Sequence, residues 1–252
     1  MSLRYDDHES YGDNTTGNVA LGFSLTDEVK LITSAGTGFK APTFNDLYWP
    51  DAFGPGNPEL EPEESVNYEI GLKGNYSQMT FEVNVFKNAI TNLIQWAPID
   101  ASNPFSAWTP KNIAEATITG AEIGLTTNLS GWFLTTSASY TETEDEETGK
   151  ELLRRPRTNF KLSLDKSFNA LDTGVDVYAQ SSLYNDAANT VEYGSYGTAD
   201  LRFAYNFVET FKVQFKASNI FDKDYTTSSG SAGTYASMGR GFHMNLIYTP
   251  KF

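Results

Sequence analysis

The sequence of 252 residues contains no cysteine and only two histidines, His8 and His243. Without cysteine, the chain cannot form disulfides, thiolate metal sites or a cysteine nucleophile. His243 has no carboxylate near it in the sequence, and the chain lacks the Gly-x-Ser-x-Gly motif of serine hydrolases. The segment "GTGFKAP" has neither the spacing nor the helix of a phosphate-binding loop. These absences leave no catalytic motif, and we do not expect an enzyme.

Long apolar runs and positive charge are also scarce. No stretch approaches the roughly 20 apolar residues that a membrane-spanning helix needs, and the mean hydropathy is −0.40. Lys and Arg number 18 against 32 Asp and Glu, and the resulting net charge of −14 would repel nucleic acid. The N-terminus has no apolar signal region, which fits a cytoplasmic protein or an internal piece of a longer secreted chain. A membrane β-barrel is compatible with all of this, because its strands are apolar on one face only.

The commonest pattern in the chain is an alternation of apolar and polar residues, which predicts strands with one apolar face. Between Val29 and Phe39, most apolar side chains fall on odd positions, whereas Lys30 and Ser34 fall on even ones. The same alternation recurs at residues 66–73, 79–85, 160–165, 199–207, 211–218 and 242–252. We predict an all-β protein of about twelve antiparallel strands of about ten residues, the length with which a tilted strand crosses a bilayer.

The predicted connections between these strands alternate between two lengths. Short turns are expected near residues 26–28, 74–75, 128–131, 169–172 and 208–210. Long polar loops are expected at residues 8–15, 41–64, 97–110, 141–156, 185–194 and 221–238. Aromatic residues favour the strand ends, with Phe23, Tyr76, Trp132, Phe207 and Tyr248 at the turn end and Phe39, Trp96, Tyr140 and Tyr184 at the loop end. Turns at one end, loops at the other and two aromatic belts are typical of a transmembrane β-barrel of the outer membrane.

Several stretches carry a more specific resemblance. They are "GTGFKAPTFNDLY" (36–48) followed by "GNPELEPEES" (56–65), then "ASNIFDKDY" (217–225) and "YASMGRGFHMNLIYTPKF" (235–252). Together they resemble the strand and loop motifs of TonB-dependent outer-membrane receptors, and the match extends over essentially the whole chain. With "TTGNVALGF" (15–23) and "LLRRPRTNFKLSL" (152–164), the sequence is most similar to the cobalamin transporter branch. The terminal Phe252 resembles the assembly signal of outer-membrane barrels, although Pro250 departs from that pattern.

The resemblance implies an active-transport receptor for cobalamin uptake, energised by TonB, in the outer membrane of a Gram-negative bacterium. Such receptors are 22-stranded barrels with a plugged lumen. Residues 1–252 would be the C-terminal portion of that barrel, without the N-terminal plug and the TonB-contact segment, and would not transport by themselves. The expected partners are outer-membrane lipid and lipopolysaccharide, the receptor's own plug and TonB, with colicins or phages as possible partners at the outer loops.

The resemblance also implies where the ligand would bind. Arg154, Tyr184 and Tyr235 match stretches that border the substrate vestibule of cobalamin transporters, with cobalamin as the transported ligand. The lumen would be lined by Lys30, Glu69, Lys73, Glu82, Glu122, Lys161, Asp165, Asp176, Asp200, Arg202, Lys212 and Lys216. No intrinsic cofactor and no metal site are expected, because the acids of "EDEE" (144–147) lack alternating ligand spacing. In the family, calcium sites lie in loops upstream of this segment.

Alternatives remain open at this point. Siderophore and haem receptors share the same scaffold. A stand-alone twelve-stranded outer-membrane barrel, such as a phospholipase or an autotransporter translocator, would also end in phenylalanine, and a soluble β-rich binding protein is the third alternative. We expect a chain of this length to close into a narrower barrel rather than to pair with a second copy, because unpaired backbone groups in lipid are costly.

Overall fold

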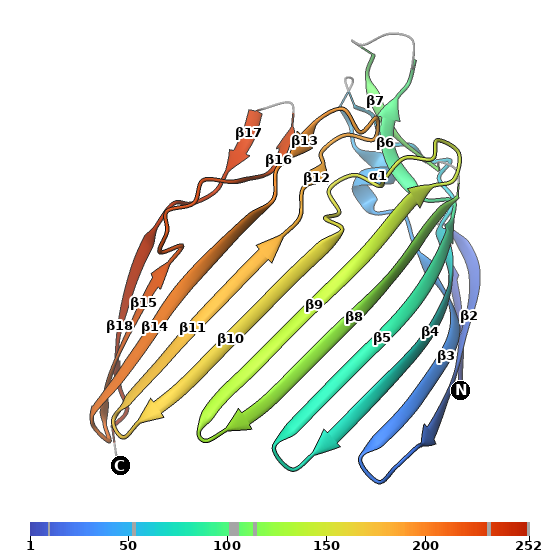
Figure 1. Ribbon diagram of the computed structural model, residues 1–252. Coiled ribbons are helices and arrows are strands. Elements are labelled where there is room, and N and C mark those ends of the chain that lie inside the picture. Colours follow the sequence, from blue (N-terminus) through green and yellow to red (C-terminus); the bar gives the residue numbers. More distant parts are fainter. Residues whose placement is uncertain (10, 52–53, 101–105, 113–114, 231–232, 251–252) are drawn as a thin grey trace.

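The computed structural model describes residues 1–9, 11–51, 54–100, 106–112, 115–230 and 233–250. These residues form one antiparallel sheet of twelve strands that curves into a trough (Figure 1). In spatial order the strands are β1 (Ser2–His8), β2 (Gly12–Ser24), β3 (Val29–Lys40), β4 (Glu63–Tyr76), β5 (Met79–Thr91), β8 (Ala116–Leu129), β9 (Trp132–Asp145), β10 (Thr158–Phe168), β11 (Leu171–Gln180), β14 (Tyr196–Val208), β15 (Phe211–Ser218) and β18 (Gly241–Tyr248). The predicted fold class and strand number are confirmed.

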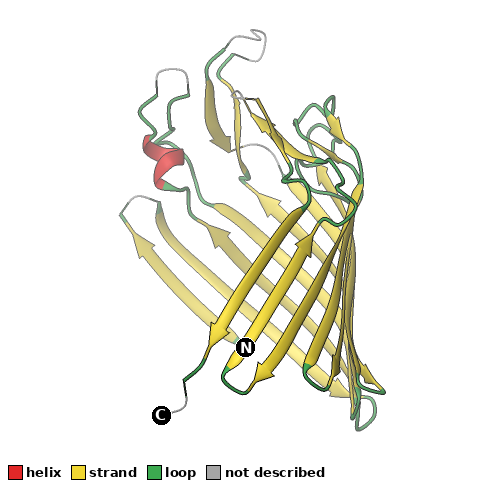
Figure 2. Ribbon diagram, turned by 90° about the vertical axis from the view of Figure 1, so that its left-hand side faces the viewer, coloured by secondary structure: helices red, strands yellow, loops and turns green. Residues whose placement is uncertain are grey.

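The two edges of the sheet are β1 and β18. Among the described residues these two strands do not pair with each other. In Figure 1, β18 and the N-terminal end of β1 lie at opposite sides of the trough, and Figure 2 views the sheet from the side of β18. The expectation that the chain closes into a narrower barrel is therefore wrong for this structure. The strands keep the gentle curvature of a wide barrel, so twelve of them complete only part of a circle.

The connections at the two ends of the trough differ as predicted. Two-residue to four-residue turns join the strands at the lower end of Figure 1, and all the long loops lie at the upper end. The loops contain three short hairpins, β6 (Ile94–Pro98) with β7 (Trp108–Asn112), β12 (Leu183–Tyr184) with β13 (Glu192–Tyr193), and β16 (Thr226–Gly230) with β17 (Gly233–Ala236). They also contain α1 (Phe44–Tyr48), which Thr43 caps at its N-terminus. Among the described residues, no helix is long and apolar enough to cross a membrane.

One predicted loop is wrong. Residues 8–15 were expected to be a long loop, but β1 and β2 pair as far as His8 and Gly12, which leaves only a tight connection between them. The polar residues of this segment extend the two strands beyond the apolar part of the sheet. A strand that extends outside the bilayer no longer needs an apolar face. Its polar composition therefore resembles that of a loop, which is why a loop was predicted here.

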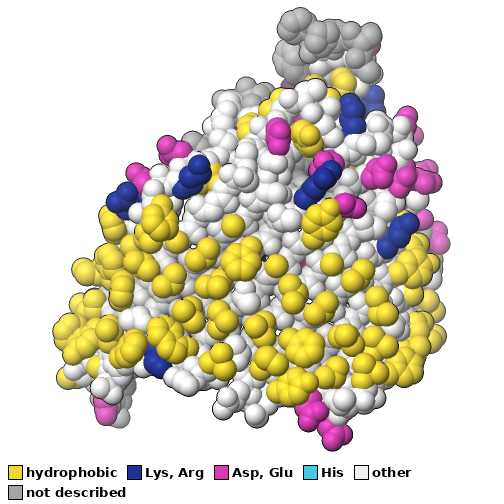
Figure 3. Space-filling view, viewed as in Figure 1, with side chains coloured by type: hydrophobic (Ala, Val, Ile, Leu, Met, Phe, Trp, Pro, Cys, Tyr) yellow, Lys and Arg dark blue, Asp and Glu magenta, His cyan; other side chains and the backbone are white. Residues whose placement is uncertain are grey.

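The two faces of the sheet differ in chemistry. The convex face carries a broad band of apolar side chains with charged groups above it (Figure 3). One cross-strand row of this face joins Val83, Ile123, Ala138, Phe160 and Ala179. The concave face carries the other half of each alternation, for example the row Asn84, Glu122, Ser139, Asn159 and Gln180. The register therefore places the predicted apolar and polar rows on opposite faces.

Aromatic residues occupy both ends of the convex face. At the turn end, Phe23, Tyr76, Trp132, Phe207 and Tyr248 are all exposed. At the loop end, Phe39 and Tyr140 belong to the sheet, whereas Trp96 and Tyr184 lie in the loop hairpins β6 and β12. The lower belt is thus as predicted, and the upper belt has fewer sheet residues than expected.

Candidate functional site

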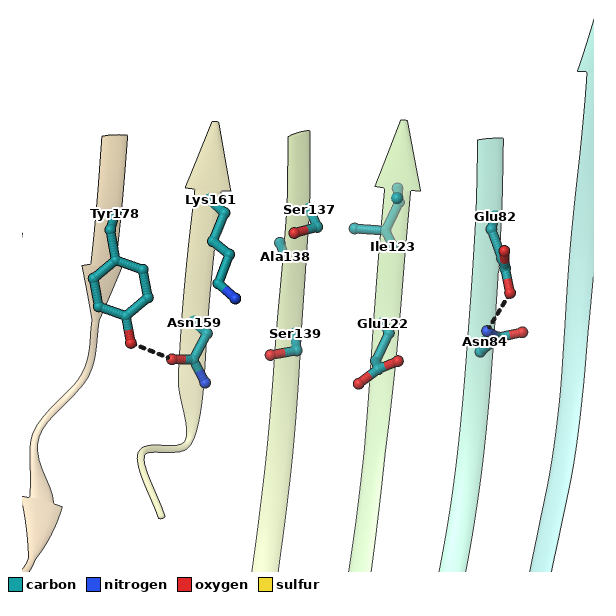
Figure 4. A pocket seen from close by; sticks show the side chains of 11 residues that line it. Glu82, Asn84, Glu122, Ile123, Ser137, Ala138, Ser139, Asn159, Lys161 and Tyr178 are labelled. Atoms are coloured by element: carbon teal, nitrogen blue, oxygen red, sulfur yellow. Dashed lines mark hydrogen bonds between the residues drawn. The ribbon is translucent and has the colours of Figure 1, made fainter. Parts of the chain in front are cut away.

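The concave wall of the trough is polar along its middle strands. A pocket on this wall is lined by Glu82, Asn84, Glu122, Ser137, Ser139, Asn159, Lys161 and Tyr178 (Figure 4). Within it, the hydroxyl group of Tyr178 donates to Asn159 at 3.0 Å, and the amide of Asn84 donates to Glu82 at 3.0 Å. Such a wall can hydrogen-bond to water or to polar protein groups inside the trough.

An ion-pair network connects strands β10, β11 and β14 on the same concave wall. The guanidinium of Arg202 lies 2.6 Å from Asp176 and 3.0 Å from Asp165, and it also donates to Ser163 at 3.0 Å. Gly174 lies between Arg202 and Asp165, and a Cβ atom there would be only 2.5 Å from the Asp165 carboxylate. The missing side chain therefore leaves the space in which these three charged groups meet.

The other charged residues predicted to line the lumen lie on the same concave face. Two further ion pairs are Lys216–Asp200 at 2.8 Å and Lys212–Asp172 at 3.6 Å. By register, all twelve charged residues predicted to line the lumen lie on the concave face, namely Lys30, Glu69, Lys73, Glu82, Glu122, Lys161, Asp165, Asp176, Asp200, Arg202, Lys212 and Lys216. The wall thus carries both signs of charge.

The long loops above the trough are joined to one another. The side chain of Asn57 donates to the carbonyl of Pro110 at 3.1 Å, and Asn112 exchanges two 2.9 Å hydrogen bonds with the backbone of Glu61. Leu60 and Pro110 are buried between these two loops. The loops of residues 41–62 and 92–115 are therefore packed against each other.

The next loop along the chain packs against the same assembly. Leu152 is buried with Leu93 and Ala116 in a small apolar cluster. The backbone N–H of Glu151 donates to the side chain of Asn189 at 2.9 Å, and Asn189 donates back to the Glu151 carbonyl at 3.0 Å. These contacts link the loop of residues 146–157 to the β12–β13 hairpin.

Arg154 is the residue that ties the last loops together. Its guanidinium donates to the side chain of Asn185 at 3.2 Å and to the carbonyl of Ser229 at 2.8 Å. Asn185 in turn bonds Ser229 through the Ser229 N–H at 3.0 Å and its hydroxyl at 3.0 Å. Arg154 has φ of 59°, and its N–H donates to the carbonyl of Tyr184 at 2.6 Å. A non-glycine residue in this left-handed region is uncommon and often marks a functional position.

The three residues predicted to contact ligand lie on loop segments that this junction connects. Arg154 bonds the backbone of Tyr184 directly, and it bonds the β16–β17 hairpin that carries Tyr235 through Ser229. Tyr235 pairs with Ser228 and is 60% exposed, whereas Tyr184 is half-buried. We call Arg154, Asn185 and Ser229 the loop junction. Asn185 was not predicted, because a single loop asparagine gives no signal in a sequence.

A cluster of three tyrosines that was not predicted, in which two rings are stacked and the third is tilted, lies at the upper end of the concave wall. The ring of Tyr225 stacks on that of Tyr196 with centroids 3.9 Å apart, and Tyr178 lies 5.8 Å from Tyr196. Tyr225 also exchanges hydrogen bonds with Ser237 across the last loop. The cluster therefore fastens the last loop to the sheet.

The "ASNIFDKDY" motif has a clear structural role. Asn219 is 5% exposed and has φ of 48°. Its side chain donates to the carbonyl of Lys223 and accepts from the Lys223 N–H, both at 2.9 Å, while its own N–H donates to Asp200 at 2.8 Å. Asparagine tolerates this left-handed conformation and satisfies a turn through its own side chain. The motif thus shapes the start of the last loop.

Acidic groups in the described part of the chain do not gather into a metal cluster. No group of three or more His, Cys, Asp or Glu residues is arranged to hold an ion there. In the "EDEE" segment, the carboxylate of Asp145 accepts from the N–H groups of Glu147 and Thr148 at 3.0 and 2.9 Å. This acid therefore closes a turn.

Comparison with known proteins adds a family relationship. The sequence matches the family described as TonB dependent receptor-like, beta-barrel over residues 1–220. The vitamin B12 transporter BtuB of Photobacterium profundum is 38% identical over 249 residues, covering 98% of this chain and 40% of the relative. BtuB of Vibrio vulnificus (strain YJ016) is 34% identical over 250 residues, covering 98% of this chain and 39% of the relative. The chain thus spans about 40% of the length of these relatives.

Solved structures share the fold. A mutant of the ferric enterobactin receptor PfeA from Pseudomonas aeruginosa, in complex with enterobactin, gives a TM-score of 0.79 at 24% identity, covering 98% of this chain and 42% of that chain. The ferric yersiniabactin uptake receptor FyuA from Yersinia pestis gives 0.75 at 20% identity, covering 94% and 37%. At these identities the likeness concerns the architecture alone.

Proposed function

The chain belongs to the TonB-dependent receptor family of outer-membrane β-barrels, and from this membership we propose that it forms the C-terminal part of the barrel of a cobalamin uptake receptor. In the intact receptor, a plug domain would occupy the polar trough and TonB would energise transport. The receptor would act as a transporter and not as an enzyme. Its ligand would be carried and released unchanged.

The observation that carries this proposal is the 38% identity to a vitamin B12 transporter along 98% of the chain. The siderophore receptors that share the fold are 24% identical or less, so they support the architecture without favouring their own ligands. The loop junction adds a geometric argument. It connects the three separate loops that carry the residues we expect at the substrate vestibule.

We assign Arg154, Tyr184 and Tyr235 to ligand contact. A guanidinium has five N–H groups, and the contacts of Arg154 to Asn185 and Ser229 use only part of them. The others can donate to polar groups at the edge of a corrinoid. Tyr235 offers an exposed ring whose face can pack against an apolar surface while its hydroxyl stays in water. This combination suits a large amphipathic ligand.

The test is cobalamin binding to cells that carry the intact receptor. We expect Arg154→Ala and Tyr235→Ala each to weaken binding about tenfold, equivalent to ~1.4 kcal/mol. Asn185→Ala tests positioning: it removes the bonds of Asn185 to Arg154 and Ser229 but no assigned ligand group, so it should weaken binding less than Arg154→Ala does. If the two test variants bind as tightly as the wild type, these residues do not contact ligand.

The same cells distinguish cobalamin from other ligand classes. Unlabelled cobalamin should displace bound labelled cobalamin, and a ferric siderophore or haem should not. Failure of wild-type cells to bind cobalamin at all, with uptake of a siderophore or haem instead, would reject the proposed ligand while leaving the family assignment intact.

A further inference from the structure

Two consecutive arginines, Arg154 and Arg155, lie in the loop that joins β9 to β10 at the upper end of the trough (Figure 1). The guanidinium of Arg154 is bonded to Asn185 and Ser229, which belong to the loops that follow β11 and β15. The guanidinium of Arg155 interacts electrostatically with the carboxylate of Glu63, at the start of β4. In the sheet, β4 and β15 lie on opposite sides of β10. The two guanidinium groups therefore reach toward opposite sides of the mouth of the trough.

Glu63 is a buried acid whose charge is balanced by a different cation. It is 8% exposed, and its carboxylate accepts from the ammonium of Lys40 at 2.8 Å and from the N–H of Ile94 at 3.1 Å. Lys40 lies directly opposite Glu63, and the two continue the concave rows of β3 and β4 at their loop ends. Because Lys40 already neutralises this carboxylate, the charge of Arg155 is left uncompensated.

Arg155 itself has no direct polar partner in the described part of the chain, where its guanidinium forms neither an ion pair nor a hydrogen bond. Its side chain reaches solvent, yet burial by the surrounding protein lowers its pKa, and the carboxylate of Glu63 acts in the opposite direction. Among the described residues, no other charged group contributes to this shift. A guanidinium in protein stays charged. Arg155 is therefore a partly enclosed cation that can accept an anion from the open side.

Arg157, two residues further along the same loop, shows the contrast. Its guanidinium donates to both carboxylate oxygens of Glu151, at 2.7 and 3.1 Å. This bidentate ion pair engages Arg157 within its own loop, as the loop junction engages Arg154. Of the three arginines in the segment "RRPR", Arg155 is thus the one whose guanidinium has all its N–H groups available within the described structure.

We propose that Arg155 binds the phosphodiester of cobalamin and so selects corrinoids that carry a nucleotide arm. This arm is the dimethylbenzimidazole nucleotide that the phosphodiester links to the corrin ring. The other groups at the edge of the ring are neutral amides, which leaves the phosphodiester as the anionic group of the periphery. The planar fork of a guanidinium matches two oxygens of a phosphate. The inference rests on the proposed function and adds which group of the ligand this residue recognises.

The local backbone supports this role. Pro156 follows Arg155 and favours an extended backbone at that residue, which limits the directions that its side chain can take. Arg154, with φ of 59°, directs its own side chain to the other side of the mouth. A ligand as large as a corrinoid can therefore contact Arg154 with the edge of its ring and Arg155 with its nucleotide arm.

The experiment measures corrinoid binding to cells that carry the intact receptor. Cobalamin is compared with cobinamide, a corrinoid that lacks the nucleotide arm and its phosphate. We expect Arg155→Gln to weaken cobalamin binding about tenfold, as for loss of a charge-assisted hydrogen bond, and to leave cobinamide binding unchanged. Arg155→Lys keeps the charge without the planar fork and should lose less. Arg157→Gln is the matched control, since it removes the same charge from the same loop, and it should leave the ratio of the two affinities unchanged.

Cobinamide phosphate separates the phosphate from the nucleoside, and its binding should again be weakened by Arg155→Gln. Unchanged binding of cobinamide also shows that this variant is folded at the cell surface. An equal loss for cobalamin and cobinamide would mean that Arg155 acts through the receptor, as a partner of the plug would, and would overturn the inference, as would equal binding of cobalamin by the wild type and Arg155→Gln. Both of these results leave the proposed function intact, whereas a wild type that binds neither corrinoid would reject the proposed function and this inference with it.

Discussion

The guanidinium of Arg202 on β14 lies 2.6 Å from the carboxylate of Asp176 on the neighbouring strand β11. The same guanidinium reaches Asp165 on β10, so one cation holds two carboxylates on the concave wall. These side chains are between a third and two-fifths exposed, and solvent therefore screens the interaction. We predict that Arg202→Met lowers the free energy of unfolding by about 1 kcal/mol, because it leaves two like charges facing each other.

Urea unfolding of the detergent-solubilised receptor measures this change. Lys212→Met is the control, because within the described part of the chain the ion-pair partner of Lys212 is a single carboxylate, that of Asp172, at 3.6 Å. It should cost less than Arg202→Met. Equal losses for the two variants would mean that the shared cation gives no extra stability.

A side chain at Gly174 is expected to destabilise the sheet modestly, because it would enter the space of the same ion pairs. A Cβ atom there would lie 2.5 Å from the Asp165 carboxylate and 2.8 Å from the guanidinium carbon of Arg202. We predict that Gly174→Ala costs about 1 kcal/mol, the lower end for overpacking, because both neighbours are flexible side chains. In an Arg202→Met background the cost should shrink, and the double-mutant cycle measures that coupling.

Gly124→Ala is the matched control for this substitution. Gly124 also lies on the concave face, opposite Ser137, but a Cβ atom there would meet nothing within 4 Å. The change should leave stability unaltered or raise it slightly. A loss in Gly124→Ala as large as that in Gly174→Ala would indicate a general intolerance of strand glycine substitution.

The strands and their two faces could be predicted because a period of two is a local property of the sequence. Val83 and Glu82 differ in polarity at adjacent positions, and that difference alone assigns them to opposite faces. The number of strands followed from counting such segments. The openness of the sheet could not be predicted, because curvature depends on the register and tilt of all strands together.

The loops show where local patterns stop being informative. Polar composition suggested a loop at residues 8–15, although these residues mostly extend β1 and β2. Arg154, Tyr184 and Tyr235 were predicted as ligand contacts from a family resemblance, and the role stays a prediction. The bonds that connect their loops run through Asn185 and Ser229. Contacts that join residues 75 positions apart have no trace in sequence spacing. Only the structure shows which contacts hold these loops together.

The β12–β13 hairpin should depend on pH through Asp186. Partial burial would raise the pKa of Asp186, but hydrogen bonds from the N–H of Val191 and from the N–H and hydroxyl of Thr190 outweigh it and hold the pKa below its ordinary value. Because the folded hairpin binds this proton less readily than the unfolded one, the contribution of the Asp186 carboxylate to hairpin stability is complete above the ordinary aspartate pKa of about 3.9. It is lost as the pH falls through the lower folded value.

Hydrogen exchange at the amide of Val191, corrected for the intrinsic exchange rate, measures this dependence. Protection should fall below about pH 4 in the wild type. Asp186→Asn is the control, since it keeps the shape without a titrating group, and its protection should be lower at neutral pH and independent of pH. A pH-dependent loss that persists in Asp186→Asn would assign the effect to another group.

The sidedness of the sheet gives the sharpest test of the whole assignment. Residues 1–252 contain no cysteine, so once any cysteine elsewhere in the receptor is replaced by serine, a single introduced cysteine carries a spin label without background. The pairs Glu82→Cys with Val83→Cys and Lys212→Cys with Val213→Cys place labels at nearly the same depth on opposite faces. In the membrane-embedded receptor, labels at Val83 and Val213 should be relaxed by oxygen, which dissolves in acyl chains, and those at Glu82 and Lys212 by a water-soluble nickel chelate.

Labels at Leu201 and Arg202 form a third pair, with Leu201 expected on the lipid side. If Val83, Leu201 and Val213 report water while their neighbours report acyl chains, the concave face cannot be the lumen of an outer-membrane barrel, because lipid-facing charges near the midplane would cost about 2–4 kcal/mol each.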